Sequence, residues 1–370
     1  MRACSPPGGG DSLLSLGGMN AVSPFGDDAG MSNASSIPAR ARSPRGRLIV
    51  LFDRLIPPAC NADRNSGSNA RFWLAQSILG ILVVLAAVFI GNEIGASVGL
   101  LLGETTEDAI SRAGVSDVLL YPVGFLIGSG IAAVLALAGY WGMMRLLRAG
   151  AVSELSGPRR LCELGAGLGW GTGVAVVLVA ILTAAGAYRI TSVGWDDGIL
   201  VGLGSGIAAG IAEELLFRGI LLRLLEAWSG TWWALALTSA LFGARHLLEG
   251  VSPIGAVLIA LNGGALLGAC YLVTRRLWLA IGLHMAANFV QGGVFGLSLF
   301  GTGNSLLHSR LTGPAFLTGG GIGIDGSPVN IIVCAAVSAI MLVVAHRRGL
   351  IVPPVWRRRR DSQEAALQRD

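Results

Sequence analysis

The sequence predicts an all-α protein, a polytopic transmembrane helical bundle of about eight spans. Three observations lead to this fold class: few charged residues, a series of long apolar runs, and an uneven distribution of arginine. Charged residues make up 13% of the 370-residue chain, and hydrophobic residues make up 53%. Soluble domains carry about 25% charged residues. A water-exposed surface of ordinary composition is therefore not expected.

The apolar runs are long enough to be membrane helices. Eight of them occur in the sequence, at residues 72–91, 118–144, 164–188, 198–225, 227–244, 251–274, 277–300 and 328–345. A helix needs about 20 residues to cross the hydrocarbon layer, and about 17 is the short end of the range. Because lipid offers no partner to free backbone groups, each run is expected to be helical.

The arginine distribution predicts the topology. The chain has no lysine, so all 27 of its basic residues are arginines. If the N-terminus is cytoplasmic, eight spans leave only Arg112, Arg189 and Arg310 in outer loops, as the positive-inside rule requires. We therefore expect an integral membrane protein, in the inner membrane if the cell is bacterial, with cytoplasmic N- and C-termini. The arginine-rich ends are interpreted as topology signals that contact membrane lipids, and no nucleic-acid partner is expected.

The chain divides into three parts by composition. Residues 1–70 are rich in glycine, serine, proline and arginine, which predicts a disordered cytoplasmic segment. Residues 71–347 form the predicted bundle, and residues 348–370 form a basic cytoplasmic tail that is expected to lack regular structure. The glycine-rich segment 301–327 is either a cover over the bundle or a spacer, and a spacer is the expectation.

Glycine recurs at every fourth position in two of the runs. The positions are Gly165, Gly169 and Gly173 in the third run, and Gly202, Gly206 and Gly210 in the fourth. Small residues at this spacing allow membrane helices to approach closely. Both series are therefore expected to pack against neighbouring helices.

Charged residues inside the fourth run require an explanation, because they are costly within a membrane. Glu214 and Arg218 are four residues apart, so they lie on one side of a helix and can form an ion pair. Glu213 points about 100° away from Glu214. The ion pair therefore accounts for one carboxylate and leaves Glu213 unmatched.

Two later runs also carry polar residues. His246 closes the fifth run, four residues after Phe242, and His284 and Asn288 lie on one face of the seventh. Taken singly, each has a structural explanation, as an interfacial histidine or an interhelical hydrogen-bonding residue. Together with the unmatched Glu213, they predict polar groups that converge inside the bundle from three helices, as a buried catalytic site requires.

These three patterns, EExxxR, FxxxH and HxxxN in this order, resemble the motifs of the CAAX protease and bacteriocin-processing family (CPBP or Abi). Its eukaryotic members include the Ras-converting CAAX prenyl endopeptidases. The resemblance covers about residues 198–294. It implies a hydrolase, an intramembrane endopeptidase. Its substrate would be a membrane-associated peptide or protein, such as a prenylated CAAX-like C-terminus or a bacteriocin leader.

The resemblance also implies the catalytic residues. Glu213 and His246 would activate a water molecule, and His284 and Asn288 would stabilise the oxyanion. Glu214 and Arg218 would not contact the substrate and would orient Glu213. The residue types suit this chemistry independently of the family, because carboxylates and imidazoles are the usual general bases. Imidazole and amide groups can also donate to a developing oxyanion.

Metal dependence and two other functions stay open at this point. The family is often labelled as metalloproteases, and a zinc ion, if present, would bind Glu213, His246 and His284. Because an HExxH motif is absent, activation of water without a metal or other cofactor is preferred. The alternatives are a non-catalytic membrane immunity or adaptor protein, or a proton-coupled transporter. The His284–Asn288 pair favours the peptidase, because a proton relay does not need an amide.

Overall fold

The computed structural model describes residues 70–102, 122–148, 152–297 and 305–368. The main α-helices are α2 (Ala70–Leu101), α4 (Pro122–Arg148), α5 (Arg160–Ala184), α6 (Gly198–Glu214), α7 (Arg223–Arg245), α8 (Pro253–Ile259), α9 (Ala265–Thr274), α10 (Trp278–Asn288), α12 (Pro328–Arg347) and α13 (Val355–Leu367). The other helical elements are the π-helical segments η3 (Leu215–Leu222), η5 (Ala260–Gly264) and η6 (Phe289–Val294), the 3-10 turns η4 (His246–Glu249), η7 (Gly320–Ile322) and η8 (Ile324–Gly326), and the helix α11 (Ala315–Thr318). The strands are β1 (Tyr188–Val193) and β2 (Leu307–Leu311). The predicted disordered segment 1–70 lies outside the described residues, apart from Ala70.

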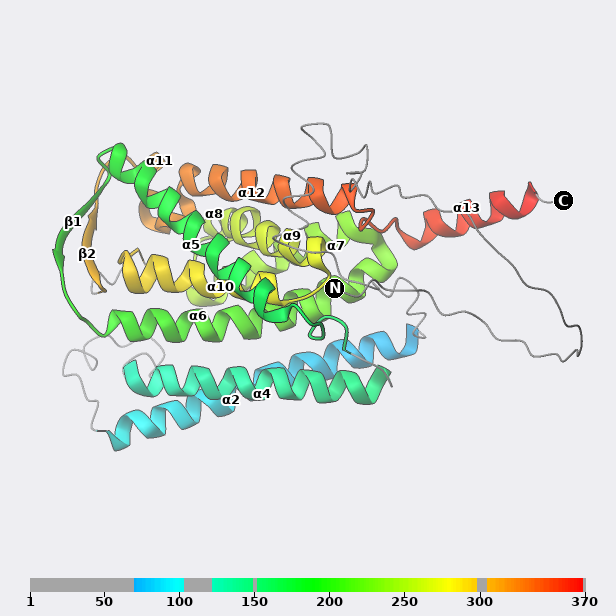
Figure 1. Cartoon of the computed structure of the whole chain (residues 1–370), viewed down its shortest axis with the longest axis horizontal. Helices are drawn as coiled ribbons and strands as arrows, with labels where there is room; N and C mark the ends of the chain where they lie inside the picture. The colour runs from blue at the N-terminus through cyan, green and yellow to red at the C-terminus, as the bar shows by residue number, and fades with distance from the viewer. Residues whose placement is uncertain (1–69, 103–121, 149–151, 298–304, 369–370) are drawn as a thin grey trace, which may run out of the picture.

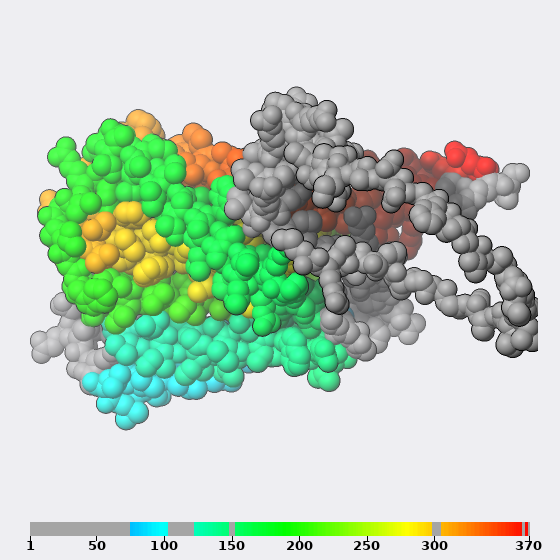
Figure 2. Space-filling model, in the orientation of Figure 1, coloured from blue at the N-terminus to red at the C-terminus, as the bar shows by residue number. Residues whose placement is uncertain are grey.

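The helices form a layered bundle, which confirms the predicted all-α class. In Figure 1, α2 and α4 lie side by side along one edge, and α12 lies at the opposite edge. Between them, α6 packs on α4, and α10 packs against both α5 and α6. Figure 2 shows yellow atoms of the α10–η6 segment between the green atoms of α5 and α6. The helix that carries His284 and Asn288 is thus held in the middle of the bundle.

All eight predicted runs contain helix, but their division into spans differs from the prediction. Within the described residues, six helical segments are long and apolar enough to cross a membrane. One of these, Gly198–Glu249, contains two predicted runs that the backbone separates only at Gly230, where φ is 78°. The seventh run is helical only from Trp278 to Val294 and is too short by this criterion.

The loop before α12 covers the end of the bundle and is not a spacer. Its strand β2 pairs antiparallel with β1, from Tyr188 opposite Leu311 to Val193 opposite Leu307. The Tyr188 hydroxyl donates to the carbonyl of Phe295 at 2.8 Å, which ties the ribbon to the end of α10–η6. Further along, η8 packs against α8 and α12. The spacer expectation was therefore wrong for the described part of this segment.

The C-terminal tail also has more structure than its composition predicts. Residues 355–367 form α13, which extends from the end of the bundle. Its Trp356 packs edge-on against Trp228 of α7, with 6.2 Å between ring centroids. Arg358 donates to the carbonyl of Ala227 at 2.6 Å. These contacts fix the first turn of the helix, and a count of charged residues could not reveal them.

The two glycine series behave differently. Gly202 and Gly206 lie close to η6 and α10, where an added Cβ would be 2.5 Å from the Gly293 nitrogen and 2.7 Å from the Met285 carbonyl oxygen. This confirms the expected close packing of the second series. The first series was assigned to the wrong face of α5. A Cβ at Gly165, Gly169 or Gly173 would meet nothing within 4 Å.

The contact face of α5 is instead formed by Gly167 and Gly171. A Cβ at Gly167 would lie 2.3 Å from the carbonyl oxygen of Leu279 in α10. The sequence does not predict which face of α5 makes this contact, because a membrane helix is apolar on all sides and has no polar face that indicates its orientation. The backbones of α5 and α10 therefore touch directly along this face.

Paired alanine substitutions would test this close approach. Gly167→Ala is expected to lower the unfolding free energy by about 1–3 kcal/mol, because its Cβ overlaps backbone that cannot move aside. Gly169 lies two residues further along α5, on its open face. Gly169→Ala should leave the unfolding free energy unchanged or raise it by up to about 1 kcal/mol, from helix propensity alone. Thermal unfolding of both variants in detergent gives the comparison. Equal midpoints would contradict the described packing of α5.

Candidate active site

The carboxylate of Glu214 lies at the centre of a buried polar cluster. Its Oε1 accepts hydrogen bonds from the Arg218 guanidinium and from Nδ1 of His284, both at 2.9 Å. The side chain of Glu214 is 0% exposed and that of Arg218 is 1% exposed. The ion pair expected from the spacing of these two residues is present, and Glu214 has a second partner on α10.

Arg218 lies in η3, where the chain changes from α-helical to π-helical winding. Its second terminal nitrogen donates to the carbonyl of Gly264, at the end of the π-helical segment η5, at 3.0 Å. Segments of π-helix release backbone groups from the regular ladder and are frequent at functional sites. The guanidinium thus connects the end of α6 with the chain between α8 and α9.

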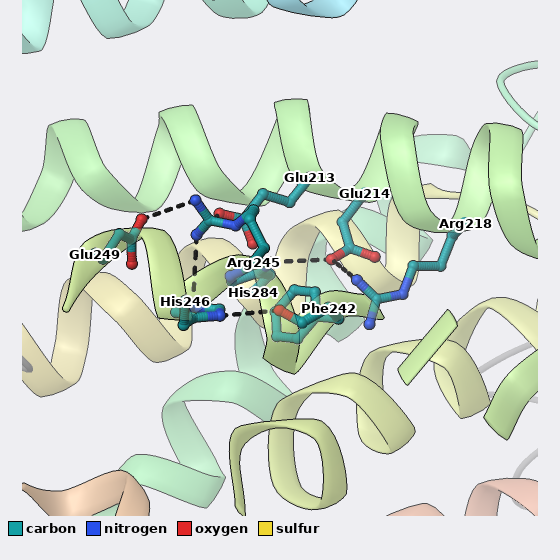
Figure 3. Close-up of polar contacts among 8 residues, drawn as sticks. All are labelled: Glu213, Glu214, Arg218, Phe242, Arg245, His246, Glu249 and His284. Carbon is teal, nitrogen blue, oxygen red and sulfur yellow. Dashed lines mark hydrogen bonds and ion pairs between the residues drawn. The ribbon is translucent and has the colours of Figure 1, made fainter. Parts of the chain in front are cut away.

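The ring of Phe242 lies between the charged and aromatic groups of the cluster. The Arg218 guanidinium is 4.7 Å from its centroid. The imidazoles of His246 and His284 pack against it at 5.3 and 6.0 Å. Figure 3 shows these side chains around Phe242. The phenylalanine of the FxxxH pattern therefore positions both histidines.

His246 follows the last residue of α7 and is the first residue of η4. Its Nδ1 lies 2.9 Å from the carbonyl oxygen of Phe242. Because a carbonyl oxygen only accepts, Nδ1 carries the proton, and a neutral ring then has a free electron pair on Nε2. That nitrogen is 3.5 Å from the Arg245 guanidinium. His246 therefore presents an acceptor to the site.

Arg245 lies between Glu213 and His246, which do not bond directly. Its guanidinium contacts Oε1 of Glu213 at 2.6 Å and Oε1 of Glu249 at 2.7 Å (Figure 3). None of the three sequence motifs includes Arg245. Its position next to the histidine of the motif is the one sequence signal that could have identified it.

His284 and Asn288 come from the same face of α10. Because the Glu214 carboxylate only accepts, His284 donates through Nδ1, and it can also donate through Nε2 when it is an imidazolium. Asn288 is half-buried, and among the described residues its side chain has no hydrogen-bond partner. Its amide is thus available to a ligand.

A carboxylate outside the predicted motifs also lies near the imidazoles. Asp325 belongs to η8 in the covering loop, where Asn262 of η5 donates to its carbonyl oxygen at 2.9 Å and Asn330 of α12 to its carboxylate at 3.2 Å. Burial raises the pKa of the Asp325 carboxyl, and interactions with His246, Asn330 and His284 partly offset this increase. No pattern in the sequence connects this loop residue with the motifs.

Three buried polar atoms of the cluster have no hydrogen-bond partner in the structure. They are Oε2 of Glu213, Oε2 of Glu214 and Nε of Arg245. Buried polar groups in native proteins are nearly always bonded, and exceptions are frequent where a ligand or water binds. The cluster therefore offers acceptors and a donor to a molecule that enters it.

The three side chains that a zinc ion would need do not converge on one point. The predicted ligands Glu213, His246 and His284 turn toward Arg245, the Phe242 carbonyl and Glu214 respectively. Nowhere in the described residues do three histidine, cysteine, aspartate or glutamate side chains converge closely enough to hold a metal. A zinc site normally has three or four such ligands around one point.

Comparison with known proteins identifies the segment that carries this cluster. Residues 194–290 match the family model described as type II CAAX prenyl endopeptidase Rce1-like. This match confirms the resemblance given by the three motifs, and it supports the general class of CAAX-type intramembrane protease. No curated protein and no solved structure matches the chain.

The buried ion pair should be essential for stability. Glu214→Gln is expected to lower the unfolding free energy by up to about 3–5 kcal/mol, because Arg218 remains buried without its counter-charge. Glu364→Gln is the matched control, since it breaks an exposed pair of the same spacing, Arg360–Glu364, and should cost about 0–1 kcal/mol. Thermal unfolding in detergent would measure both. A Glu214 variant as stable as the control would refute a structural role for the pair.

Proposed function

We propose, from the Rce1-like family to which residues 194–290 belong and from the geometry of the cluster, that this integral membrane protein is an intramembrane endopeptidase. Its substrate is a membrane-associated peptide or protein, with a lipid-modified CAAX-like C-terminus or a leader segment. Both termini of the enzyme lie in the cytoplasm. The catalytic residues are Glu213, His246, His284 and Asn288.

One observation carries this proposal. Side chains from α6, the α7–η4 junction and α10 meet in one buried, hydrogen-bonded cluster, and several of their polar atoms lack a partner. A helix-packing clamp would need only Glu214 and Arg218. The additional carboxylate of Glu213 and the acceptor nitrogen of His246 fit the activation of a water molecule.

The reaction begins with a water molecule between Oε2 of Glu213 and Nε2 of His246. Both atoms are acceptors, so they orient the two hydrogens of the water and leave its oxygen free to attack. As the new C–O bond forms, one proton moves to the base and a negative charge develops on the substrate carbonyl oxygen. The amide of Asn288 and the His284 imidazolium, held by Glu214, donate to this oxyanion.

The second step breaks the peptide bond. The tetrahedral intermediate collapses, the C–N bond breaks, and the proton held by the base moves to the leaving amine. The products are a carboxylic acid and a free amine, so atoms and charges balance without an added reactant. Each of the four residues thus has a task in forming or resolving the intermediate.

Substitution of the base tests the assignment. Glu213→Gln retains the size of the side chain and removes the base, so it should abolish cleavage while membrane insertion stays normal. Asn288→Ala removes one oxyanion donor and should lower kcat by about 10²–10³ with little change in KM. The double variant should lose far less than the product of the two effects, because residues that act as a unit are not additive.

The same assay separates the competing functions. A library of lipidated and unlipidated peptides is incubated with the purified protein in liposomes, and the products are identified by mass spectrometry. An adaptor would cleave no peptide, and Glu213→Gln would leave its affinity for its partner unchanged. A proton-coupled transporter would also cleave nothing, and Glu213→Gln would abolish its transport. If the variant cleaves as fast as the natural chain, Glu213 is not the base.

Cleavage should not depend on a divalent metal. Because the three candidate ligands are each bonded elsewhere, removal of metals by chelators is expected to leave kcat/KM within about twofold, well below the loss seen when a catalytic metal is removed. The measurement compares chelated enzyme with enzyme dialysed against buffer alone. Loss of activity on chelation, with recovery when zinc is added, would overturn activation of water by the side chains alone.

A further inference from the structure

A cavity of about 490 Å³ lies at the end of the bundle from which α13 extends. One of its walls is formed by Trp232 and Trp233 of α7, just after the bend at Gly230. The other wall is formed by His346, at the end of α12, and by the segment that leads into α13 as far as Arg357. Because α12 is long and apolar enough to cross a membrane, the cavity at its end lies at the level of the lipid headgroups.

The two walls are held together by the chain itself. The backbone nitrogen of Thr231 donates to the Val352 carbonyl at 2.9 Å, and the Val352 nitrogen donates to the Thr231 hydroxyl at 2.8 Å. At Gly230 the two segments approach so closely that an added Cβ would lie 2.7 Å from the Pro354 nitrogen. The shape of the cavity is therefore fixed without a ligand.

Two side chains of the cavity can donate to a molecule that enters it. Arg357 and His346 are both exposed, and within the described part of the chain neither side chain forms a hydrogen bond or an ion pair. Arg357 is nevertheless well placed, because the residues on either side of it, Trp356 and Arg358, both contact α7. A pre-positioned guanidinium with unused donors is suited to a phosphate group.

The charge around the cavity favours an anion. Residues 346–360 include six arginines and no acidic residue. Glu226 accepts a hydrogen bond from Thr231, but it is already paired with Arg275 and does not oppose a second anion. Basic pockets between membrane helices are typical sites for acidic lipid headgroups.

The tryptophans indicate that this anion has an apolar part. Trp232 and Trp233 are 54% and 66% exposed, and they lie on a helix of a membrane-crossing segment. Tryptophan is enriched where membrane meets water, because its ring is apolar and its N–H is polar. A ligand that meets cations on one side of the cavity and indole rings on the other is an amphipathic anion, as a phospholipid is.

We propose that this cavity is a binding site for the headgroup of an anionic phospholipid. Arg357 and His346 donate to its phosphate, and Trp232 and Trp233 contact the glycerol and the first carbons of the acyl chains. This inference goes beyond a general attraction of the basic chain ends to lipid, because it assigns the lipid to one place and to named donors. It does not depend on the proposed peptidase chemistry.

The test measures lipid binding to the purified full-length chain, delipidated in an uncharged detergent, by native mass spectrometry. Phosphatidylglycerol and phosphatidylcholine with identical acyl chains are titrated separately. The first phosphatidylglycerol should bind about tenfold to hundredfold more tightly, the range for hydrogen bonds to a charged group that no choline cation opposes. Equal affinity for the two lipids would overturn the inference. Displacement of the bound lipid by an equal concentration of glycerol phosphate would identify a site for soluble anions instead, which also overturns it.

Variants locate the site. Arg357→Gln should lower the affinity for phosphatidylglycerol by about tenfold or more, and Arg357→Lys should retain part of it, because lysine keeps the charge and loses the fork. The matched control is Arg359→Gln, which removes the same charge from an exposed arginine of the same helix that does not line the cavity. It should change the affinity by less than about twofold. Equal losses in Arg357→Gln and Arg359→Gln would show a diffuse attraction to net charge and refute a defined site.

Thermal unfolding provides a second measurement that does not depend on counting lipids. Because Arg357 is exposed and makes no side-chain contact of its own, Arg357→Gln should unfold at the same temperature as the natural chain when no lipid is added. Phosphatidylglycerol should raise the Tm of the natural chain and of Arg359→Gln, since a ligand that binds the folded state stabilises it. The same rise in Arg357→Gln would contradict the proposed donor.

Discussion

The Glu214 carboxylate is the group on which the arrangement of the cluster depends. A carboxylate removed from water is stable inside a protein only if it is paired and hydrogen-bonded. Glu214 meets this requirement with Arg218 from the next turn of its own segment and with His284 from α10. Because the second of these bonds comes from α10, α6 and α10 cannot shift along each other without breaking the hydrogen bond between His284 and Glu214.

Close backbone packing fixes the same helices from the other sides. Glycines on α6 allow direct approach to α10 and η6, and Gly167 does the same between α5 and α10. The helix that carries His284 is thus held by the hydrogen bond from His284 to Glu214 and by backbone contacts with α5 and α6. Rigid placement of this kind is what an oxyanion donor requires, since its benefit falls rapidly when its distance from the reacting atom changes.

The sequence predicts the features that depend on spacing along one helix, and it fails where partners come from distant segments. The Glu214–Arg218 pair and the shared face of His284 and Asn288 follow from helical periodicity alone. The bond from His284 to Glu214 joins residues 70 positions apart, and Asp325 approaches the imidazoles from a glycine-rich loop. The face of α5 that packs against α10 could not be predicted either, because the helix is apolar on all sides and has no polar face that would indicate its orientation.

The three arginine–glutamate contacts of the site fall into two groups, which differ mainly in their access to water. Glu214 and Arg218 are fully buried, and loss of either partner would leave an isolated buried charge. This pair therefore contributes to the stability of the fold. Glu213, Arg245 and Glu249 are 13–32% exposed, and water can screen them when contacts change. The buried Glu214–Arg218 pair is therefore a permanent contact, whereas the partly exposed contacts of Arg245 can exchange partners. A charged group that enters the site would therefore compete with Glu213 and Glu249 for Arg245, and not with the buried Glu214–Arg218 pair.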